Sequence, residues 1–299
     1  MGIEILCRLF GKTRHAYYDQ LWRRRDTDLK DDLILQIVQE IRSSLPRIGT
    51  RKLHFMVNEK LADHNLTAGR DYLFDLLSRY KMLIRTRRRR AITTDSRHWM
   101  RKYSNLVIDL KLDRREQLWV SDITYIRLLN GFVYLSLITD AYSRKIVGYS
   151  LRRDLSAAGC IEALQMALLN RVTPLQSLIH HSDRGSQYCC KEYVDLLMEN
   201  NIAISMTNNG DPYENAIAER VNGIIKSEFS LYSSSCGYEE TGSMVARSIV
   251  LYNSLRPHSS CDYLTPDQAH SKTGELEKKW KNYNKPLLLT HKFEKNGLV

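Results

Sequence analysis

The segment L-W-V-S-D-I-T-Y-I, residues 118–126, says most about the fold of this chain. Its β-branched and aromatic residues are typical of a strand that is buried on both faces. An unpaired carboxylate in such a strand is costly, so it implies a partner such as a cation, a metal or a hydrogen-bond network. Asp122, in the middle of this strand, is therefore the first candidate functional residue.

A second aspartate closes another apolar run. The segment S-L-I-H-H-S-D covers residues 177–183 and is followed at once by the turn residues of R-G-S-Q-Y. Sixty residues lie between Asp122 and Asp183. His180 and His181 precede this aspartate, and neighbouring side chains of a strand point to opposite faces. We interpret both histidines as packed strand residues or DNA neighbours rather than metal ligands.

The third acid lies in a predicted helix, D-P-Y-E-N-A-I-A-E-R-V-N-G-I-I-K, residues 211–226. Asp211 suits the N-cap, Pro212 the first helical position and Glu214 the third. Together they make a capping box, which predicts a helix that begins there.

This predicted helix is amphipathic at about 100° per residue. One stripe is polar and holds Asn215, Glu219, Asn222 and Lys226. The roughly opposite stripe is aliphatic and holds Ile217, Val221, Ile224 and Ile225. We therefore expect the helix to pack on its aliphatic side chains and to present Glu219 outward with the two amides and the lysine.

The three acids together indicate a metal site. Thirty-five residues lie between Asp183 and Glu219. A strand aspartate, a strand-end aspartate and a helix glutamate that converge form an all-oxygen site for hard divalent cations, which suits phosphoryl transfer with two metal ions. Taken singly, each acid is more simply a strand-edge charge, a turn former or a surface acid. Asp140, which begins the turn A-Y-S-R, is interpreted as such a turn former.

Five sequence blocks in order resemble the integrase-type catalytic core of bacterial insertion-sequence transposases, and specifically the second-reading-frame (OrfB) type. The resemblance covers roughly residues 118–269. The blocks are W-V-S-D-I-T-Y-I, L-I-T-D-A-Y-S-R-K-I-V-G-Y-S-L, H-S-D-R-G-S-Q-Y, N-G-D-P-Y-E-N-A-I-A-E-R and Y-N-S-L-R-P-H-S-S-C-D-Y-L-T-P-D-Q-A.

The resemblance implies an α/β RNase H-like core with a D-D-35-E triad. Carried over by motif, the triad is Asp122, Asp183 and Glu219. It would bind two Mg²⁺ or Mn²⁺ ions in each active site, cleave DNA at the ends of the element and join the freed 3′-OH to a target phosphodiester. Lys226 matches the basic residue seven positions after the glutamate.

The chain departs from the family pattern after this glutamate. Similar proteins often have two aromatic residues there, whereas this chain has Arg220, Val221 and Asn222, which puts the local DNA contacts in doubt. Arg184, beside the second aspartate, and Arg220 are further candidate DNA contacts.

The charge of the chain supports nucleic-acid binding independently. The formal net charge is +11, and residues 1–117 hold 26 Lys and Arg against 15 Asp and Glu, while residues 118–299 hold 19 of each. A basic segment beside a neutral segment with buried acids suggests a DNA-binding module attached to a metal-dependent catalytic module.

The basic segment has helical spacing. A short helix, a glycine turn and a second helix from near Thr13 are predicted at its start. Two further helices are predicted around the joint A-D-H-N-L, with apolar residues at Leu53, Met56, Val57 and Leu61 and then at Tyr72, Leu73, Leu76 and Leu77. The pattern alone fits a helix-turn-helix and an ordinary helical hairpin equally, and the resemblance favours the DNA-binding version.

An arginine run follows these helices. It comprises Arg85, Arg87, Arg88, Arg89 and Arg90. So dense a run is either a solvated linker or an arm that binds phosphates or a minor groove. We favour the arm, because the run lies between the helical module and the catalytic strands.

Composition excludes several other classes. The start of the chain lacks the apolar core of a signal peptide, and no segment is long and apolar enough for a membrane span, so we expect no membrane partner and a cytoplasmic location, nucleoid-associated when bound to DNA. The six cysteines are scattered without zinc spacing, and we interpret them as reduced thiols.

These patterns predict three parts: a helical DNA-binding region over 1–100, an α/β RNase H-like catalytic core over 115–235 and a helical C-terminal part over 236–299. Strands are predicted near 118–127, 132–140, 144–152, 177–183 and 202–206. The alternatives are a DNA-binding regulator with an inactive core and a related nuclease that cleaves without joining.

The expected partners are double-stranded DNA, both element ends and target, and further copies of the chain in a synaptic complex. Proteins of this type often act as a fusion with an upstream-frame (OrfA) product that carries a coiled coil. This chain begins with its own methionine and shows no heptad run. Activity alone and activity only in such a fusion are both left open.

Overall fold

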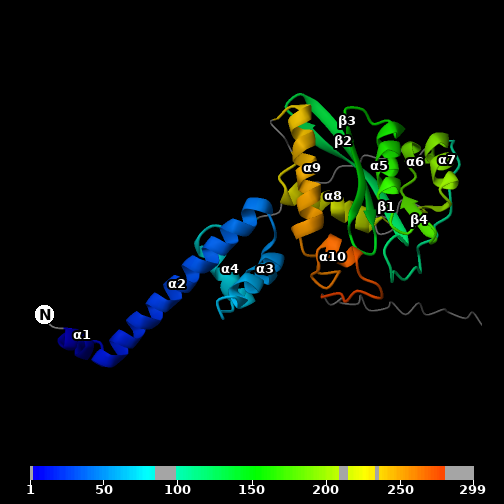
Figure 1. Ribbon diagram of the computed structural model, residues 1–299. Coiled ribbons are helices and arrows are strands. Elements are labelled where there is room, and N and C mark those ends of the chain that lie inside the picture. Colours follow the sequence, from blue (N-terminus) through cyan, green and yellow to red (C-terminus); the bar gives the residue numbers. More distant parts are fainter. Residues whose placement is uncertain (1–2, 85–98, 209–214, 233–235, 280–299) are drawn as a thin grey trace, which may run out of the picture.

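The protein is described here by a computed structural model that covers residues 3–84, 99–208, 215–232 and 236–279 (Figure 1). Within these residues five strands form one mixed sheet in the order β3-β2-β1-β4-β5. The strands are β1 (Leu118–Leu128), β2 (Gly131–Asp140), β3 (Ile146–Arg152), β4 (Leu178–Ser182) and β5 (Ile202–Met206). β2 is antiparallel to β1 and β3, and β4 is parallel to β1 and β5. Each strand ends within two residues of its predicted range, so the strand predictions are confirmed.

Helices cover both faces of the sheet (Figure 1). One face carries α5 (Ala157–Leu169), α6 (Ser186–Cys189) and α7 (Lys191–Glu199). The other carries α8 (Ala216–Glu228) and α9 (Tyr238–Leu255), and the short α10 (Pro266–His270) contacts α9. This is the RNase H-like α/β core that the sequence resemblance implies.

Strand β1 divides its side chains between the two layers. Trp119 is fully buried among side chains of α5 and α7. Leu118 and Val120 pack with Ala218 of α8 on the other face. Since side chains alternate along a strand, Asp122 lies on the face that α8 covers.

The basic N-terminal region is helical, as predicted. Its helices are α1 (Ile3–Leu9), α2 (Arg14–Ser44), α3 (Thr50–Ala62) and α4 (Arg70–Arg79). Gly11 has a φ of 62°, and Thr13 accepts a hydrogen bond from the backbone N–H of Ala16 at 3.1 Å. The predicted glycine turn and helix start near Thr13 are therefore confirmed, while DNA binding by α3 and α4 stays a prediction.

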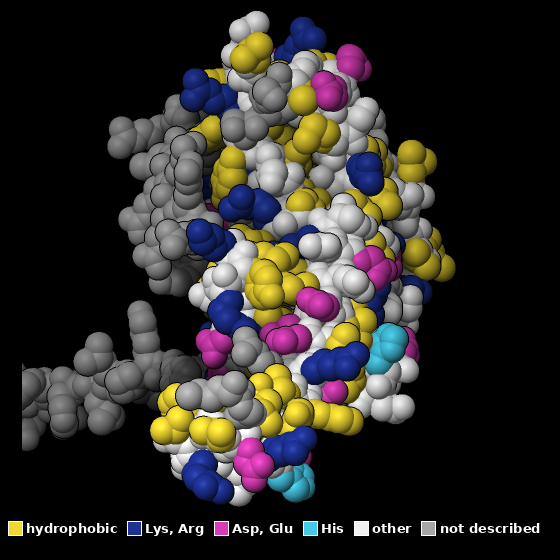
Figure 2. Space-filling model, turned by 90° about the vertical axis from the view of Figure 1, so that its left-hand side faces the viewer, with side chains coloured by type: hydrophobic (Ala, Val, Ile, Leu, Met, Phe, Trp, Pro, Cys, Tyr) yellow, Lys and Arg dark blue, Asp and Glu magenta, His cyan; other side chains and the backbone are white. Residues whose placement is uncertain are grey.

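The two halves of α2 have different surroundings. The second half packs with α3 and α4 around fully buried leucines, including Leu53, Leu61 and Leu73. In the first half, every side chain described between Arg14 and Leu29 is exposed. We call residues 3–29 the arm, and Figure 1 shows it projecting away from the sheet. Figure 2 looks at the molecule from this side, and hydrophobic side chains gather at its lower end, where the arm points towards the viewer.

Two contacts join the N-terminal helices to the core. The backbone N–H of Arg47 donates to the carbonyl of Glu228, the last residue of α8, at 3.0 Å. Phe55 of α3 stacks on Tyr263, with ring centroids 4.7 Å apart and ring planes 10° from parallel. The helical region therefore rests on the end of α8.

The C-terminal helices also lie against the core. Asn253 of α9 exchanges hydrogen bonds of 3.0 and 2.9 Å with the backbone of Ile146 in β3. The proposed division of the chain near residue 236 stays a prediction. At the turn between β2 and β3, Asp140 accepts from the backbone N–H of Ser143 at 2.8 Å, which confirms its role as a turn former.

Candidate active site

Two of the three predicted acids lie level with each other on neighbouring parallel strands. β1 and β4 pair with Val120 opposite His181. Asp122 and Asp183 each lie two residues further along their own segment, and both are half-buried. Parallel pairing thus aligns two carboxylates that are far apart in the sequence.

Hydrogen bonds orient both aspartates. The backbone N–H of Ile123 donates to Oδ1 of Asp122 at 2.9 Å, and Nδ2 of Asn222 on α8 donates to its Oδ2 at 2.8 Å. The backbone N–H of Gly185 donates to Oδ1 of Asp183 at 3.0 Å. The turn that follows β4 therefore holds the second carboxylate, and α8 holds the first.

The third acid, Glu219, is exposed in the first turn of α8 and still influences the aspartates. Burial raises the pKa of Asp122 to about 7, the Asn222 hydrogen bond opposes this shift, and the negative charges of Asp183 and Glu219 add to it. Burial and the charge of Asp183 also raise the pKa of Glu219. The three carboxylates therefore act within one electrostatic site.

The chemistry of this site fits a hard divalent cation. Carboxylate oxygens are the ligands that Mg²⁺ and Mn²⁺ prefer, and a cation would relieve the accumulated negative charge that raises the pKa of Asp122. Oδ1 of Asn222 is buried without a hydrogen-bond partner, so it can accept from a cation-bound water. In the part of the chain that the structure describes, no three His, Cys, Asp or Glu side chains lie close enough together to hold a metal ion as they stand.

Helix α8 begins later than the capping signals predicted. It starts at Ala216 with Asn215 as N-cap, four residues after the predicted first helical position. Asp211, Pro212 and Glu214, the predicted capping box, lie outside the described residues.

The expectation that the polar stripe of α8 faces outward is wrong for its two amides. Nδ2 of Asn215 donates to the carbonyl of Ser121 in β1 at 2.9 Å, and Asn222 is held by Asp122 as described above. Both amides are buried, and only Glu219 is exposed. The amides are buried because the strand offers them a carbonyl and a carboxylate as acceptors.

Lys226, on the same stripe, is half-buried against two tyrosines. Its Nζ lies 4.9 Å from the ring centroid of Tyr125 and 5.8 Å from that of Tyr232, and it donates to the carbonyl of Tyr125 at 3.4 Å. Burial lowers the pKa of Lys226, while the charge of Asp122 raises it. The ammonium is thus held beside the acids, and its contact with DNA stays a prediction.

An ion pair that the sequence analysis missed anchors the far end of α8. Nε and Nη2 of Arg256, which is fully buried, donate to the two carboxylate oxygens of Glu228 at 2.7 Å each. Nη1 lies 2.9 Å from Nε2 of His258. Burial first and the charge of Arg256 second lower the pKa of nearby Lys52 to about 8. R-P-H was part of the resemblance, but no pattern in the sequence pairs its arginine with this glutamate.

The histidines of β4 are packed, as predicted. Nε2 of His180 lies 2.9 Å from Oγ of Ser121 and 2.8 Å from the hydroxyl of Tyr193, and burial lowers the pKa of His180 to about 3. Nδ1 of His181 lies 2.9 Å from Oγ of Ser205. Each of the two rings is therefore held by at least one hydrogen bond within the core.

The remaining candidate DNA contacts are arginines. Arg184 is half-buried next to the second aspartate, and Arg220 is exposed next to the glutamate. The run Arg85, Arg87, Arg88, Arg89 and Arg90 lies outside the described residues.

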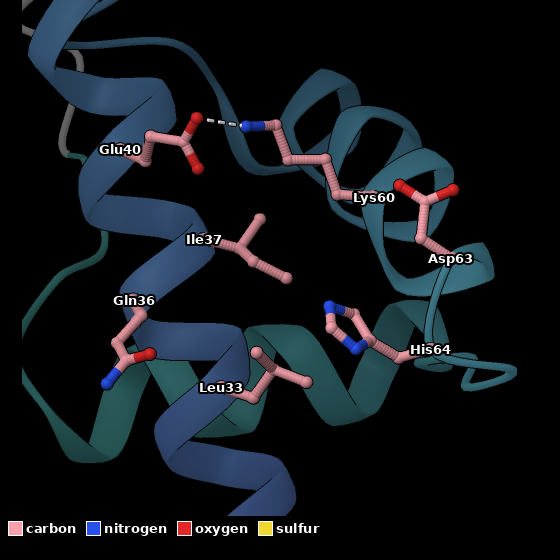
Figure 3. A pocket seen from close by; sticks show the side chains of 7 residues that line it. All are labelled: Leu33, Gln36, Ile37, Glu40, Lys60, Asp63 and His64. Atoms are coloured by element: carbon pink, nitrogen blue, oxygen red, sulfur yellow. Dashed lines mark hydrogen bonds and ion pairs between the residues drawn. The ribbon is translucent and has the colours of Figure 1, made fainter.

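A hollow of about 350 Å³ lies away from the acids, between α2 and α3 (Figure 3). An ion pair between Lys60 and Glu40 spans it. Its lining is Leu33, Gln36, Ile37, Glu40, Lys60, Asp63 and His64. It contains none of the three predicted acids, and we assign it no chemistry.

The sequence matches the integrase core domain family twice, over residues 113–212 and over residues 200–266. An uncharacterized 31 kDa protein of insertion element IS600 from Shigella sonnei is 30% identical over 265 residues, which is 87% of this chain and 96% of that protein. The transposase InsF of insertion sequence IS3A from Escherichia coli K12 is 29% identical over 279 residues, 91% of this chain and 94% of that protein.

Among solved structures, the HTLV-2 integrase catalytic core domain in complex with magnesium is similar at a TM-score of 0.42 and 19% identity. The match covers 52% of this chain and 97% of that one. None of the described helices has the length and apolar character that crossing a membrane requires.

Proposed function

This chain belongs to the insertion-sequence transposases that carry an integrase core domain, and on that premise we propose that it cleaves the DNA ends of an insertion sequence and joins them to target DNA. The proposal is carried by one observation. The parallel pairing of β1 with β4 aligns Asp122 with Asp183, and the charge of Glu219 on α8 adds to the raised pKa of Asp122.

The three acids would hold two Mg²⁺ or Mn²⁺ ions. Asp122 and Asp183 would be ligands of these ions together with Glu219. When bound, the two ions stabilise the attacking and the leaving oxygen of an in-line displacement. Asn222 would keep the carboxylate of Asp122 turned towards the ions through its 2.8 Å hydrogen bond.

Each step of the reaction forms one P–O bond and breaks another. Water first displaces one ester oxygen at the end of the element and frees a 3′-OH. This 3′-OH then attacks a target phosphodiester, so one P–O bond forms as another breaks. No external energy source is needed, and the protein has to position the DNA and stabilise charge.

Basic residues would hold the DNA. Arg184 and Arg220 directly follow Asp183 and Glu219 in the chain, and the charge of Asp122 partly offsets the burial that lowers the pKa of Lys226. All three would contact phosphates next to the reacting bond. The N-terminal helices and the arginine run from Arg85 to Arg90 would bind the terminal inverted repeats. If the run contacts phosphates, neutralising it should flatten the salt dependence of binding by about 0.9 units of log–log slope per lost contact. An unchanged slope would identify a solvated linker.

The chain would act in the bacterial cytoplasm on double-stranded DNA, as a homo-oligomer that holds two element ends in a synaptic complex. An upstream-frame product is a further proposed partner. The helices of residues 1–100 would bind DNA, and the core of residues 115–235 would carry out catalysis. The helical C-terminal part would begin near residue 236.

A strand-transfer assay with a labelled element end tests the proposal. Asp122→Asn, Asp183→Asn and Glu219→Gln should each lower cleavage and joining by about a thousandfold or more, because losing a metal position removes several kcal/mol of charge stabilisation. DNA binding in a mobility-shift assay should remain. Asp109→Asn and Glu192→Gln change exposed acids elsewhere and should leave activity unchanged.

The same assay separates the alternative functions. Joined product supports the transposase, cleavage without joining supports a nuclease, and a mobility shift alone supports a regulator. Ca²⁺ should support binding with little chemistry, because its looser geometry positions the reacting oxygens poorly. A triad variant with near-normal strand transfer would overturn the assignment of the site.

A further inference from the structure

Helix α3 meets the core through the face that carries Lys52. Phe55 lies three residues further along this face and stacks on Tyr263. The backbone N–H of Arg47, before α3, donates to the carbonyl of Glu228 at 3.0 Å. Lys52 lies between these two contacts in the sequence and is half-buried. Its ammonium group is therefore held at the junction between the helical region and the core.

Positive charge accumulates around Lys52. Burial and then the charge of Arg256 lower its pKa to about 8, and the charge of Glu228 opposes this shift. Two further cations, Arg220 and Arg51, lower the pKa as well. We call Lys52, Arg220 and Arg256 the junction cluster. A concentration of one sign of charge attracts ligands of the other sign.

The acid at the junction is already paired. Both carboxylate oxygens of Glu228 accept from Arg256, at 2.7 Å each. Among the residues that the structure describes, no carboxylate forms an ion pair with Nζ of Lys52. A half-buried ammonium has lost part of its hydration, and here no close carboxylate compensates for that loss. The junction cluster can therefore accept an anion from outside the chain.

The start of α3 favours an anion as well. α3 begins at Thr50, and its N-cap Gly49 has no side chain that could accept from the helix. The first turn contains Arg51 and Lys52 and no acid. Because the N-terminal end of a helix carries partial positive charge, these cations add to it, and a bound anion would be stabilised by both.

We propose that the junction cluster binds a phosphodiester of the DNA backbone. This inference rests on the proposed function, in which the helical region and the core hold the same DNA. Lys52 and the exposed Arg220 would donate to the phosphate oxygens, while Arg256 would stay paired with Glu228 and add its charge. A strand held here would run along α8, the helix that carries Glu219. Inorganic phosphate has the same oxyanion chemistry, and competition separates the two sources.

Binding of this phosphate should be coupled to protonation of Lys52. The pKa of about 8 should rise beside a phosphate, because an anion favours the charged ammonium. Below about pH 8 the ammonium is charged with and without DNA, so this group leaves the affinity constant. Above that pH, binding has to restore the proton, so the affinity for DNA falls as pH rises.

The groups that surround Lys52 do not titrate in the same way. They are Arg51 on α3, Arg220 and Glu228 on α8, and Arg256 and His258 after α9. Arginines keep their charge between pH 7 and 9. Burial lowers the pKa of His258 well below its ordinary value, and the charge of Arg256 adds to this, so the ring is neutral over the same range.

Fluorescence anisotropy of a labelled DNA duplex with the full chain, in EDTA, measures the coupling. Between pH 7 and 9 the dissociation constant of the wild type should rise about five- to tenfold, as expected when a pKa near 8 rises to about 9 or above. Lys52→Arg should bind with an affinity that is constant over this range, because arginine keeps its charge. Lys52→Met should bind about tenfold more weakly at pH 7, with a salt slope lower by about 0.9.

Lys60→Met is the matched control. Lys60 lies on the same helix and pairs with Glu40, away from the junction. This variant should keep the affinity and the pH dependence of the wild type. An unchanged pH dependence in Lys52→Arg, or equal weakening by the two methionine substitutions, would overturn the proposal. Lys52→Arg keeps a cation at the site, so the pH test stands even if Lys52→Met fails to fold.

Inorganic phosphate, added at constant ionic strength, tests the source of the anion. It should leave DNA binding unchanged. Phosphate that displaces DNA from the wild type but not from Lys52→Met would assign the site to the free ion and overturn the DNA assignment. All these measurements omit metal. A wild type that binds no DNA at any pH would contradict the proposed function itself, whereas a pH-independent affinity together with normal strand transfer would overturn only the junction site.

Discussion

Helices α8 and α2 differ in which of their side chains are buried and which are exposed. α8 buries the amides Asn215 and Asn222 against β1. The first half of α2 leaves Tyr18, Trp22 and Leu29 in solvent. In both helices the polarity of the stripe alone would suggest the reverse.

A polar or apolar stripe is buried where the rest of the fold offers it suitable hydrogen-bond acceptors or apolar surface. An amide that is buried without a hydrogen bond costs about 1–3 kcal/mol. β1 removes that cost by offering a carbonyl and the Asp122 carboxylate, so the polar stripe of α8 becomes part of the acid site. In the described part of this chain nothing covers Tyr18, Trp22 and Leu29 in the same way, and all three stay exposed.

The largest effect should come from Asp122→Asn, which should abolish activity and raise stability. The carboxyl has a pKa of about 7 in the folded protein, above the ordinary value of 3.8. As pH rises from about 4 to 7, the unfolded chain loses this proton first, so the wild type loses stability across that window. Because asparagine does not titrate, the Asp122→Asn variant should not lose stability in this pH window. The melting temperatures of the wild type and of Asp122→Asn, measured in EDTA, should nearly coincide at pH 4. At pH 8 the variant should melt several degrees higher, since one kcal/mol of stability corresponds to about 2–4 °C.

Adding Mg²⁺ should reverse the order of the two proteins. A ligand stabilises the state that binds it, so the melting temperature of the wild type should rise and that of Asp122→Asn should not. An equal response of both proteins to Mg²⁺ would show that Asp122 is not a ligand.

The next effect should come from the amide that holds this carboxylate. Asn222→Leu should lower strand transfer about 10- to 100-fold near neutral pH, the usual cost of losing the residue behind a metal ligand. Because the Asn222 hydrogen bond lowers the pKa of Asp122, its loss should also move the acidic limb of the pH–rate profile upward. Asn215→Leu, which breaks only the bond to Ser121, is the control and should leave that limb in place. A limb that moves equally in both variants would contradict a specific role for Asn222.

A smaller effect is expected at Lys226. Lys226→Met keeps the packing on Tyr125 and removes the charge, so affinity for the element end should fall about tenfold and the salt slope by about 0.9. Lys226→Arg should retain more binding because the charge survives. Lys272→Met, exposed in the C-terminal part, is the control. Equal behaviour of the two methionine variants would show that the lysine serves only to pack α8.

The smallest effect should come from the arm. Trp22→Glu should change the free energy of unfolding of the monomer by no more than about 0.5 kcal/mol, because an exposed side chain loses no packing. Urea titration of the wild type and the variant measures this. A loss above about 2 kcal/mol would show that the arm folds back on its own chain, and the contrast between α2 and α8 would disappear.

Local signals predicted the strands well and the start of α8 poorly. The β-branched runs around Asp122 and before Asp183 can form little besides buried strands, so their ranges were confirmed. At α8, the D-P-Y-E segment satisfied every capping rule, yet the helix begins at Ala216. There the side chain of Asn215 is held by Ser121, a residue 94 positions away, and a bond of that kind leaves no periodic trace in the sequence.

The five strands, the N-terminal helices and the three acids with their spacing can be predicted from the sequence, because periodicity, turn residues and motif order are local properties of the chain. Tertiary contacts, by contrast, bring Asn222 to Asp122 and Arg256 to Glu228 and leave Tyr18, Trp22 and Leu29 exposed. Each of these depends on which surfaces meet after folding. An amphipathic helix specifies two faces, and the hydrogen-bond acceptors and apolar surfaces that reach it through the fold decide which of the two is buried.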